Sequence, residues 1–190
     1  ADFLRRGFGA LIEVMRPGAP IYVAHADTSG LTFRRCFVEA GFKLASCLIW
    51  RKNALVLSRG DYHWQHEPIL YGWKPGAAHR WFGGRDKCTV LDEDRPTASA
   101  EHPTMKPVGL VAQMLRNSAP VGASVLDPFG GSGSTLMACD ALGLQARLIE
   151  IDPRFVDVIV QRWQGATGGI AQLGGEQPFA EVAGIRGVAE

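Results

Sequence analysis

A chain of 190 residues with 46% hydrophobic and 21% charged residues has the composition of an ordinary globular domain. Its formal net charge of +1 neither requires nor excludes a nucleic-acid partner, since a local basic patch decides such binding. No apolar run approaches the ~20 residues of a transmembrane helix, and the four cysteines form no CxxC pair. We therefore expect reduced thiols in a cytoplasmic protein, without a membrane span and without a metal site.

The first half of the chain predicts alternating helices and strands. Apolar residues at helical spacing predict a first helix that ends before Pro17-Gly18, and short apolar runs predict buried strands. Pro68 lies early in the third strand, which places it at a strand start or on a sheet edge. In chain order the predicted elements are a helix over 2–15, a strand over 20–25, a helix from Thr28 or Ser29 to Ala40, a strand over 42–50, a polar connection over 51–65 with a turn at Gly60-Asp61, and a strand over 67–73.

The second half continues the alternation after an irregular segment. Pro107 suits the first position of a helix, and Asp152 followed by proline is a typical helix start. In chain order we predict a long loop or insert over 74–103, a helix from Pro107, a strand over 124–127, a helix to Leu142, a strand over 145–151, a helix from Pro153 ended by Gly165, and a glycine-rich tail over 165–190.

Strands that alternate with helices indicate an α/β fold, with a doubly wound, mostly parallel sheet and helices on both faces. The expected organisation is one core over residues 1–164, which includes the insert, followed by the tail. Ligands of such sheets bind beyond the carboxyl ends of the strands.

The stretch LDPFGGSGSTL, residues 126–136, places a glycine-rich turn at such a strand end. A phosphate-binding P-loop needs a lysine after the last glycine, and none follows Gly133. A dinucleotide fingerprint needs a third glycine where Leu136 stands. A tight turn that only requires positive φ is a further alternative, but three glycines within four residues exceed that need.

A fourth interpretation is a nucleoside ligand without a pyrophosphate. Asp127 closes the strand before the turn, and Glu150 closes the next strand, about where an acidic residue reaches ribose hydroxyls. A carboxylate accepts both hydroxyl protons and repels a phosphate. S-adenosylmethionine, with its ribose, adenine and methionine tail, is such a ligand.

Three motifs in this order resemble those of the DNA amino-methyltransferases: HPTMKP, then LDPFGGSGSTL, then RLIEIDPRFVDVIVQRW. The resemblance spans most of the chain and is to the permuted group, in which the cofactor half follows the catalytic half. It implies a Rossmann-like methyltransferase fold, S-adenosylmethionine as cofactor and double-stranded DNA as partner. It also implies methylation of the exocyclic amine of adenine or cytosine, as in bacterial or phage-encoded restriction–modification systems, and a homodimer, since many relatives in this group pair up.

The resemblance also assigns cofactor-binding residues. Glu150 matches the acid that binds ribose, and HPTMKP matches the segment that holds the methionine end, where Lys106 would pair with the cofactor carboxylate. The residues implied to bind cofactor are Asp127, Pro128, Phe129, Gly131, Ser132, Gly133, Glu150, His102, Thr104 and Lys106.

In the family the strand that here reads LIWRKN faces the target base. The resemblance therefore implies that Trp50 stacks on a flipped-out base and that Arg51 or Lys52 contacts a phosphate. The alternative for Trp50 is a place in the hydrophobic core. A target-recognition role for the insert over 74–103 rests on the resemblance alone, because basic and acidic residues nearly balance there.

The family's catalytic motif, D-P-P-Y or S-P-P-Y, does not occur in the sequence. In the permuted order it would precede the first helix, so we expect an incomplete chain that is inactive alone. Its sheet would lack one or two central strands between the strands at 124–127 and 20–25. Two alternatives stay open: a non-catalytic DNA- or cofactor-binding protein of the same fold, and a nicotinamide-dependent oxidoreductase. The choice between adenine and cytosine also stays open.

Overall fold

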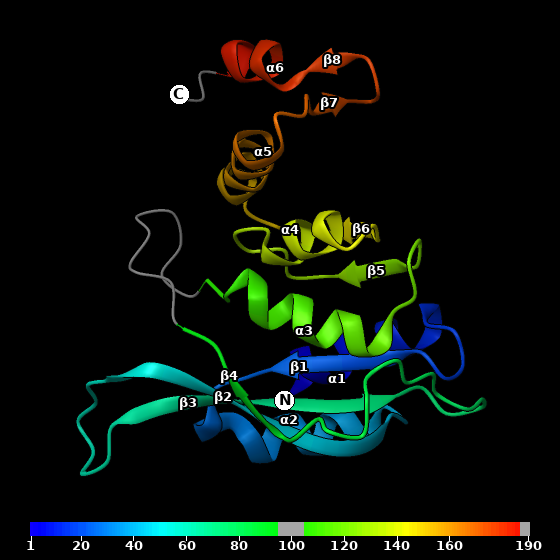
Figure 1. The fold of residues 1–190 in the computed structure, drawn as a ribbon, viewed down its shortest axis with the longest axis vertical. Helices are drawn as coiled ribbons and strands as arrows, with labels where there is room; N and C mark the ends of the chain where they lie inside the picture. The colour runs from blue at the N-terminus through cyan, green and yellow to red at the C-terminus, as the bar shows by residue number, and fades with distance from the viewer. Residues whose placement is uncertain (95–104, 187–190) are drawn as a thin grey trace. The chain divides into compact units, whose positions relative to one another are not determined.

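The computed structural model describes residues 1–94 and 105–186, and the chain divides into two units (Figure 1). The N-terminal unit comprises Ala1–Arg95 with Gln113–Pro120, and the C-terminal unit comprises Pro96–Ala112 with Val121–Glu190. Helix α3, Val108–Ser118, contributes residues to both.

The N-terminal unit is built on a four-stranded sheet in the order β1-β3-β2-β4. Strand β3 runs antiparallel to both of its neighbours, whereas β2 and β4 are parallel. The antiparallel pairing follows from the short connection between β2 and β3, since a parallel pair needs a long crossover. The elements are α1 Asp2–Val14, β1 Pro20–Ala24, a 3-10 turn at Asp27–Ser29, α2 Gly30–Glu39, β2 Lys43–Val56, β3 Trp64–Trp73 and β4 Val90–Asp92.

The prediction for Pro68 was wrong, because this proline lies inside the central strand β3. The pairing with β1 ends at Ala24 and Ile69, and beyond it the Pro68 carbonyl accepts one bond from the His25 N–H at 3.2 Å. Proline has no N–H to return to His25, so this pair has one hydrogen bond where a regular antiparallel ladder has two, and the pairing with β1 ends there.

Helices cover both faces of this sheet, as predicted. On one face, α1 and α2 bury an aromatic core with the strands; its buried members are Phe8, Ile21, Cys36, Phe37, Phe42 and Leu70. On the other face, the Tyr22 hydroxyl shares a 2.6 Å hydrogen bond with the Ser118 hydroxyl at the end of α3. Burial raises the pKa of Tyr22 to about 12, so this phenol stays protonated and keeps its bond at neutral pH.

The C-terminal unit carries a parallel pair of strands, β5 and β6, with helices after each strand. Helix α5 continues past Gly165 and ends at Gly168, whose φ of 69° is the left-handed conformation typical of a helix C-terminus. One glycine inside a helix costs only about 1 kcal/mol, which explains why Gly165 does not end it. The elements are β5 Ser124–Asp127, α4 Ser134–Ala141, β6 Gln145–Leu148, α5 Pro153–Thr167, β7 Gln172–Leu173, β8 Gln177–Pro178 and α6 Phe179–Arg186.

Two segments are more regular than the sequence pattern predicts. The insert over 74–103 contains the short strand β4 next to β2, and the tail contains the β7–β8 hairpin and α6. Strand β4 has three residues, and β7 and β8 have two each, so none of them is long enough to show the alternating pattern by which a strand is recognised.

Within the described residues, β1 is paired only with β3, and β5 is paired only with β6. Each therefore has one edge whose backbone groups form no sheet hydrogen bonds. The same described residues contain no helix with the length and apolar character needed to cross a membrane.

The packing of β3 against β2 yields a stability prediction at Gly72. A Cβ added there would lie 2.1 Å from the Lys43 carbonyl oxygen and 3.0 Å from the Phe37 ring. We expect Gly72→Ala to lower the free energy of unfolding by about 1–3 kcal/mol, because backbone and core must both shift. Gly7→Ala in α1 is the control: its Cβ meets nothing within 4 Å, and it should stabilise by about 0.5–1 kcal/mol. Urea unfolding followed by tryptophan fluorescence measures both, and equal effects would contradict the close packing.

Candidate functional site

The candidate site is the glycine turn between β5 and α4. Gly131 and Gly133 adopt φ of 55° and 82°, the left-handed region that favours glycine. The Gly130 N–H donates to the Ile149 carbonyl at 2.9 Å, and the Gly133 N–H donates to the Gly130 carbonyl at 2.8 Å. One backbone bond therefore fixes the turn to the segment after β6, and the turn leads directly into α4, whose N-cap is Gly133.

Asp127, at the end of β5, is bonded into the turn. Its carboxylate accepts the Phe129 N–H at 3.0 Å and the Thr135 hydroxyl at 2.6 Å. Burial raises the pKa of this carboxyl above its ordinary value, and the nearby charge of Glu150 adds to the rise, while the two hydrogen bonds oppose it. Asp127 thus joins the strand end to the first turn of α4.

Glu150 lies two residues beyond the end of β6 and also contacts the turn. One carboxylate oxygen accepts the Gly131 N–H at 2.8 Å, and the other accepts the Asp152 N–H at 3.0 Å. These backbone donors, Asp152 first, lower the pKa of Glu150 below its ordinary value, so the side chain is ionised at neutral pH. A carboxylate has about four acceptor positions, so this one keeps capacity for hydroxyl donors.

Lys106 is brought to the same turn through its backbone. Its carbonyl accepts the Ser134 hydroxyl at 2.6 Å, which links the end of the HPTMKP segment to the start of α4. His102 and Thr104, the other residues predicted from that segment, lie outside the described residues.

The remaining predicted cofactor residues differ in exposure. Phe129 is 63% exposed, Pro128 is half-buried, and Ser132 is buried. The turn therefore offers an ionised acid and an exposed aromatic ring, and the sequence places no lysine directly after its last glycine. This set of groups suits a ribose and a planar base better than a phosphate.

Trp50 lies in the core of the N-terminal unit. Its side chain is 1% exposed, and its indole N–H donates to the Glu93 carbonyl at 2.8 Å. This placement favours the core alternative over base stacking, because the ring is covered by protein.

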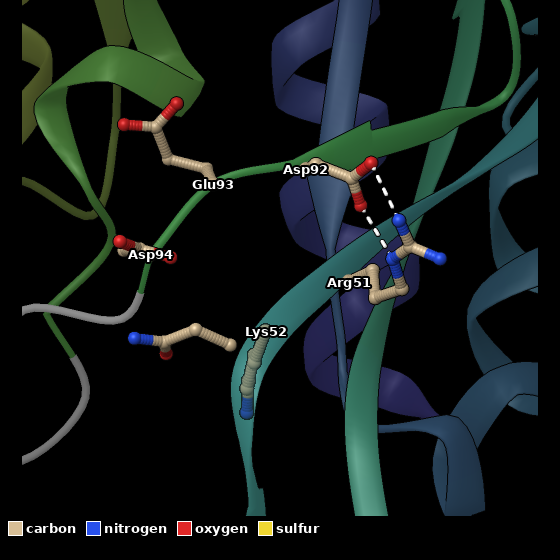
Figure 2. A pocket seen from close by; sticks show the side chains of 6 residues that line it. Arg51, Lys52, Asp92, Glu93 and Asp94 are labelled. Atoms are coloured by element: carbon tan, nitrogen blue, oxygen red, sulfur yellow. Dashed lines mark hydrogen bonds and ion pairs between the residues drawn. The ribbon is translucent and has the colours of Figure 1, made fainter.

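Arg51 and Lys52 each form an ion pair with a carboxylate. Arg51 makes two bonds to Asp92, at 2.6 and 2.7 Å, and the Lys52 ammonium lies 2.7 Å from Glu67. Figure 2 shows Arg51 pointing toward Asp92, while Lys52 points away from Asp92, Glu93 and Asp94. These residues, with Asn53, line a hollow of about 510 Å³ whose charges are largely compensated.

Sequence reasoning missed two hydroxyl residues of the site, Ser134 and Thr135. They bind Lys106 and Asp127, respectively, and so fix both segments that flank the glycine turn. The only signal was their position: they are the first two residues of α4, where short polar side chains reach neighbouring backbone.

The sequence model of the DNA methylase family, which describes N6/N4 methyltransferases, matches residues 1–161. A strand–glycine turn–helix with an acid after the next strand is the nucleoside-binding half of a Rossmann-like fold. With most of its length matched, the chain belongs to the DNA methylase family.

Curated relatives are somewhat more than a quarter identical to the chain over the aligned residues. Type II methyltransferase M.Cfr9I of Citrobacter freundii is 28% identical over 173 residues, covering 84% of this chain and 58% of the relative. Type II methyltransferase M.XycI of Xanthomonas campestris pv. cyanopsidis is 27% identical with the same coverage. The chain thus spans 58% of the length of these two relatives.

Solved structures share the fold at lower identity. The M1.HpyAVI–SAM complex matches with a TM-score of 0.74 and 21% identity, covering 84% of this chain and 81% of that one. The cytosine-N4-specific PvuII DNA methyltransferase matches with a TM-score of 0.76 and 15% identity, covering 85% and 70%. The predicted α/β, Rossmann-like methyltransferase fold is thereby confirmed.

The bond between Thr135 and Asp127 yields a second prediction. Thr135→Val keeps the shape but removes the hydroxyl donor, so the free energy of unfolding should fall by about 1.5–3 kcal/mol at pH 7. Loss of the bond should also raise the pKa of Asp127 further. Both proteins carry protonated Asp127 below the ordinary aspartate pKa of 3.8, so the difference should shrink as the pH falls toward that value.

Denaturant unfolding of both proteins between pH 4 and 7 measures this difference. Thr135→Ser is the matched control, because it retains the hydroxyl and should stay close to the parent at every pH. A loss of stability that is equally large for Ser and Val, or that does not depend on pH, would contradict the assigned contact.

Proposed function

We propose that the protein is the cofactor half of a DNA methyltransferase that transfers a methyl group from S-adenosylmethionine to the exocyclic amine of adenine or cytosine. Membership in the DNA methylase family supports the reaction class. The proposal of this cofactor rests mainly on the ionised Glu150 carboxylate, which is hydrogen-bonded to the glycine turn and can still accept further hydrogen bonds.

The described residues fit this cofactor by the chemistry of their donors and acceptors. Glu150 would accept the ribose hydroxyls, Phe129 would contact the adenine, and Lys106 would face the methionine carboxylate. His102 and Thr104 belong to the same proposal through the sequence motif. When bound, S-adenosylmethionine supplies a methyl group on a sulfonium, which is already a good leaving group, so the protein contributes mainly proximity and orientation.

Two solved structures of cofactor-bound proteins are consistent with this proposal as relatives of the fold. One is the M1.HpyAVI–SAM complex; the other is TTHA0409 of Thermus thermophilus complexed with S-adenosyl-L-methionine, with a TM-score of 0.67, 21% identity and coverage of 88% of this chain and 78% of that one. Both are structures to which this chain is similar in fold.

We further propose that this chain is incomplete as a catalyst and inactive alone. The sequence contains neither D-P-P-Y nor S-P-P-Y, whose polar residue and backbone carbonyl would orient the target amine. The unpaired edges of β1 and β5 and the greater length of the curated relatives point in the same direction. Sequence added at these edges would supply both the catalytic motif and the missing ladder bonds.

The proposed substrate is double-stranded DNA in the bacterial cytoplasm, and the proposed assembly is a homodimer. The insert over 74–103 is the proposed target-recognition element. The tail expected over 165–190 is proposed to begin only after α5, which includes Gly165 and is capped by Gly168. Arg51 would reach a phosphate only by exchanging its Asp92 partner, and the exposed location of that pair makes such an exchange inexpensive.

A non-catalytic DNA- or cofactor-binding protein of the same fold is the second candidate. The burial of Trp50 and the carboxylate partners of Arg51 and Lys52 favour the cofactor-binding form of this candidate, since all three side chains are engaged within the protein. Methyl transfer to DNA by this chain alone would exclude it.

Calorimetric titration tests the cofactor proposal. S-adenosylhomocysteine and its 2′,3′-dideoxy analogue are each titrated into the parent chain and into Glu150→Gln. The parent should lose about tenfold to a hundredfold in affinity for the dideoxy analogue, because charge-assisted bonds to both hydroxyls disappear. Glu150→Gln should bind S-adenosylhomocysteine more weakly than the parent chain does, and its affinities for the two ligands should be nearly equal.

Comparing two ligands in two proteins forms a double-mutant-type cycle. It separates loss of the ribose contact from damage to the turn, which is needed because Glu150 also binds two backbone N–H groups. Glu176→Gln in the β7–β8 turn is the control and should behave as the parent. Equal preference for the two ligands in the parent chain, or full discrimination retained in Glu150→Gln, would contradict the assignment of Glu150.

A further inference from the structure

Helix α5 contacts the glycine turn at its buried face. Ile159 is the buried residue of this helix. A Cβ added at Gly130 would lie 3.2 Å from the Ile159 side chain, and one added at Gly133 would lie 3.0 Å from it. The backbone of the turn therefore rests directly on α5, with no room for a side chain between them.

A second contact follows one turn later on the same helix face. Arg162, three residues after Ile159, donates from Nη1 to the carbonyl oxygen of Ser132. Ser132 is only 5% exposed and Arg162 is half-buried, so this charge-assisted bond is partly shielded from water, which strengthens it relative to an exposed one. Arg162 also lies just beyond residues 1–161, which the family model matches.

A turn rich in glycine has many accessible conformations, so it needs contacts from outside to hold one of them. Glu150 accepts the Gly131 N–H, and Arg162 donates to the Ser132 carbonyl. The acceptor and the donor lie on adjacent residues of the turn, so together these two bonds set the orientation of the peptide units between them.

We infer that Arg162 is a positioning residue of the glycine turn: its guanidinium holds the Ser132 carbonyl toward α5 and thereby preorganises the turn for ligand binding. The identity of that ligand rests on the proposed function, whereas the effect on the turn does not. Preorganisation raises affinity by removing the ordering cost from the binding step.

Amide hydrogen exchange in the ligand-free chain, together with calorimetric titration of S-adenosylmethionine, tests this inference. The variants are Arg162→Met, Arg162→Lys and Arg147→Met. Arg147 is the matched control, since it is an arginine of the same unit that donates to a main-chain carbonyl, that of Ala146 at 2.9 Å, away from the turn.

In Arg162→Met the Gly131 and Gly133 amides should exchange about tenfold faster than in the parent, and S-adenosylmethionine should bind about tenfold more weakly, at a temperature where all variants are folded. Arg162→Lys should retain most of the exchange protection and most of the affinity, because lysine keeps a charged donor. Arg147→Met should match the parent in both measurements.

Unchanged exchange at the turn in Arg162→Met, or a lysine variant as impaired as the methionine variant, would overturn the inference. Faster exchange with unchanged affinity would also overturn it, because the bond would then be merely structural. If the parent chain bound no S-adenosylmethionine while the exchange pattern appeared as expected, the positioning of the turn would stand and the proposed cofactor would fail.

Discussion

The site depends on one carboxylate, that of Glu150, which bridges the Gly131 N–H and the Asp152 N–H. Through this bridge the glycine turn after β5 and the start of α5 are held by a single side chain. Its negative charge is stabilised by backbone donors, which lower its pKa and leave it ionised for further donors. Asp127 on the other strand end behaves differently, since burial raises its pKa. Two acids at neighbouring strand ends thus differ in their surroundings: Asp127 is bonded within the turn, and Glu150 is the proposed ligand acceptor.

Much of this unit was predictable from sequence because its signals are local. The glycines at 131 and 133, the Asp152 cap with its proline, and the strand before Asp127 each act within a few residues, and the structure has all of them. What could not be predicted depends on tertiary neighbours. Pro68 sits in a central strand because β1 ends beside it, and Thr135 matters because it reaches Asp127. The sequence left two interpretations open for Trp50, and its burial, which favours the core, depends on neighbours distant in the chain such as the Glu93 carbonyl.

The two units divide the proposed function between them. The C-terminal unit contains the proposed cofactor-binding residues that the structure describes, whereas the N-terminal unit has a well-packed core and a hollow lined by both basic and acidic side chains. The absence of D-P-P-Y from the sequence and the open edges of β1 and β5 among the described residues are the observations behind the proposal that this chain is inactive alone. A folded cofactor half that lacks its catalytic strand would bind the nucleoside and leave DNA unmodified, which distinguishes the account from that of a complete enzyme.

The most direct test is an amide NMR titration of the chain with S-adenosylhomocysteine, because it reports every backbone position at once. The account predicts saturable shifts concentrated at residues 127–133 and at Glu150, with the hollow around Arg51 and Asp92 unaffected. Shifts concentrated at that hollow, or no shifts at the glycine turn in a chain that gives the spectrum of a folded protein, would contradict the central claim that this turn is a nucleoside site.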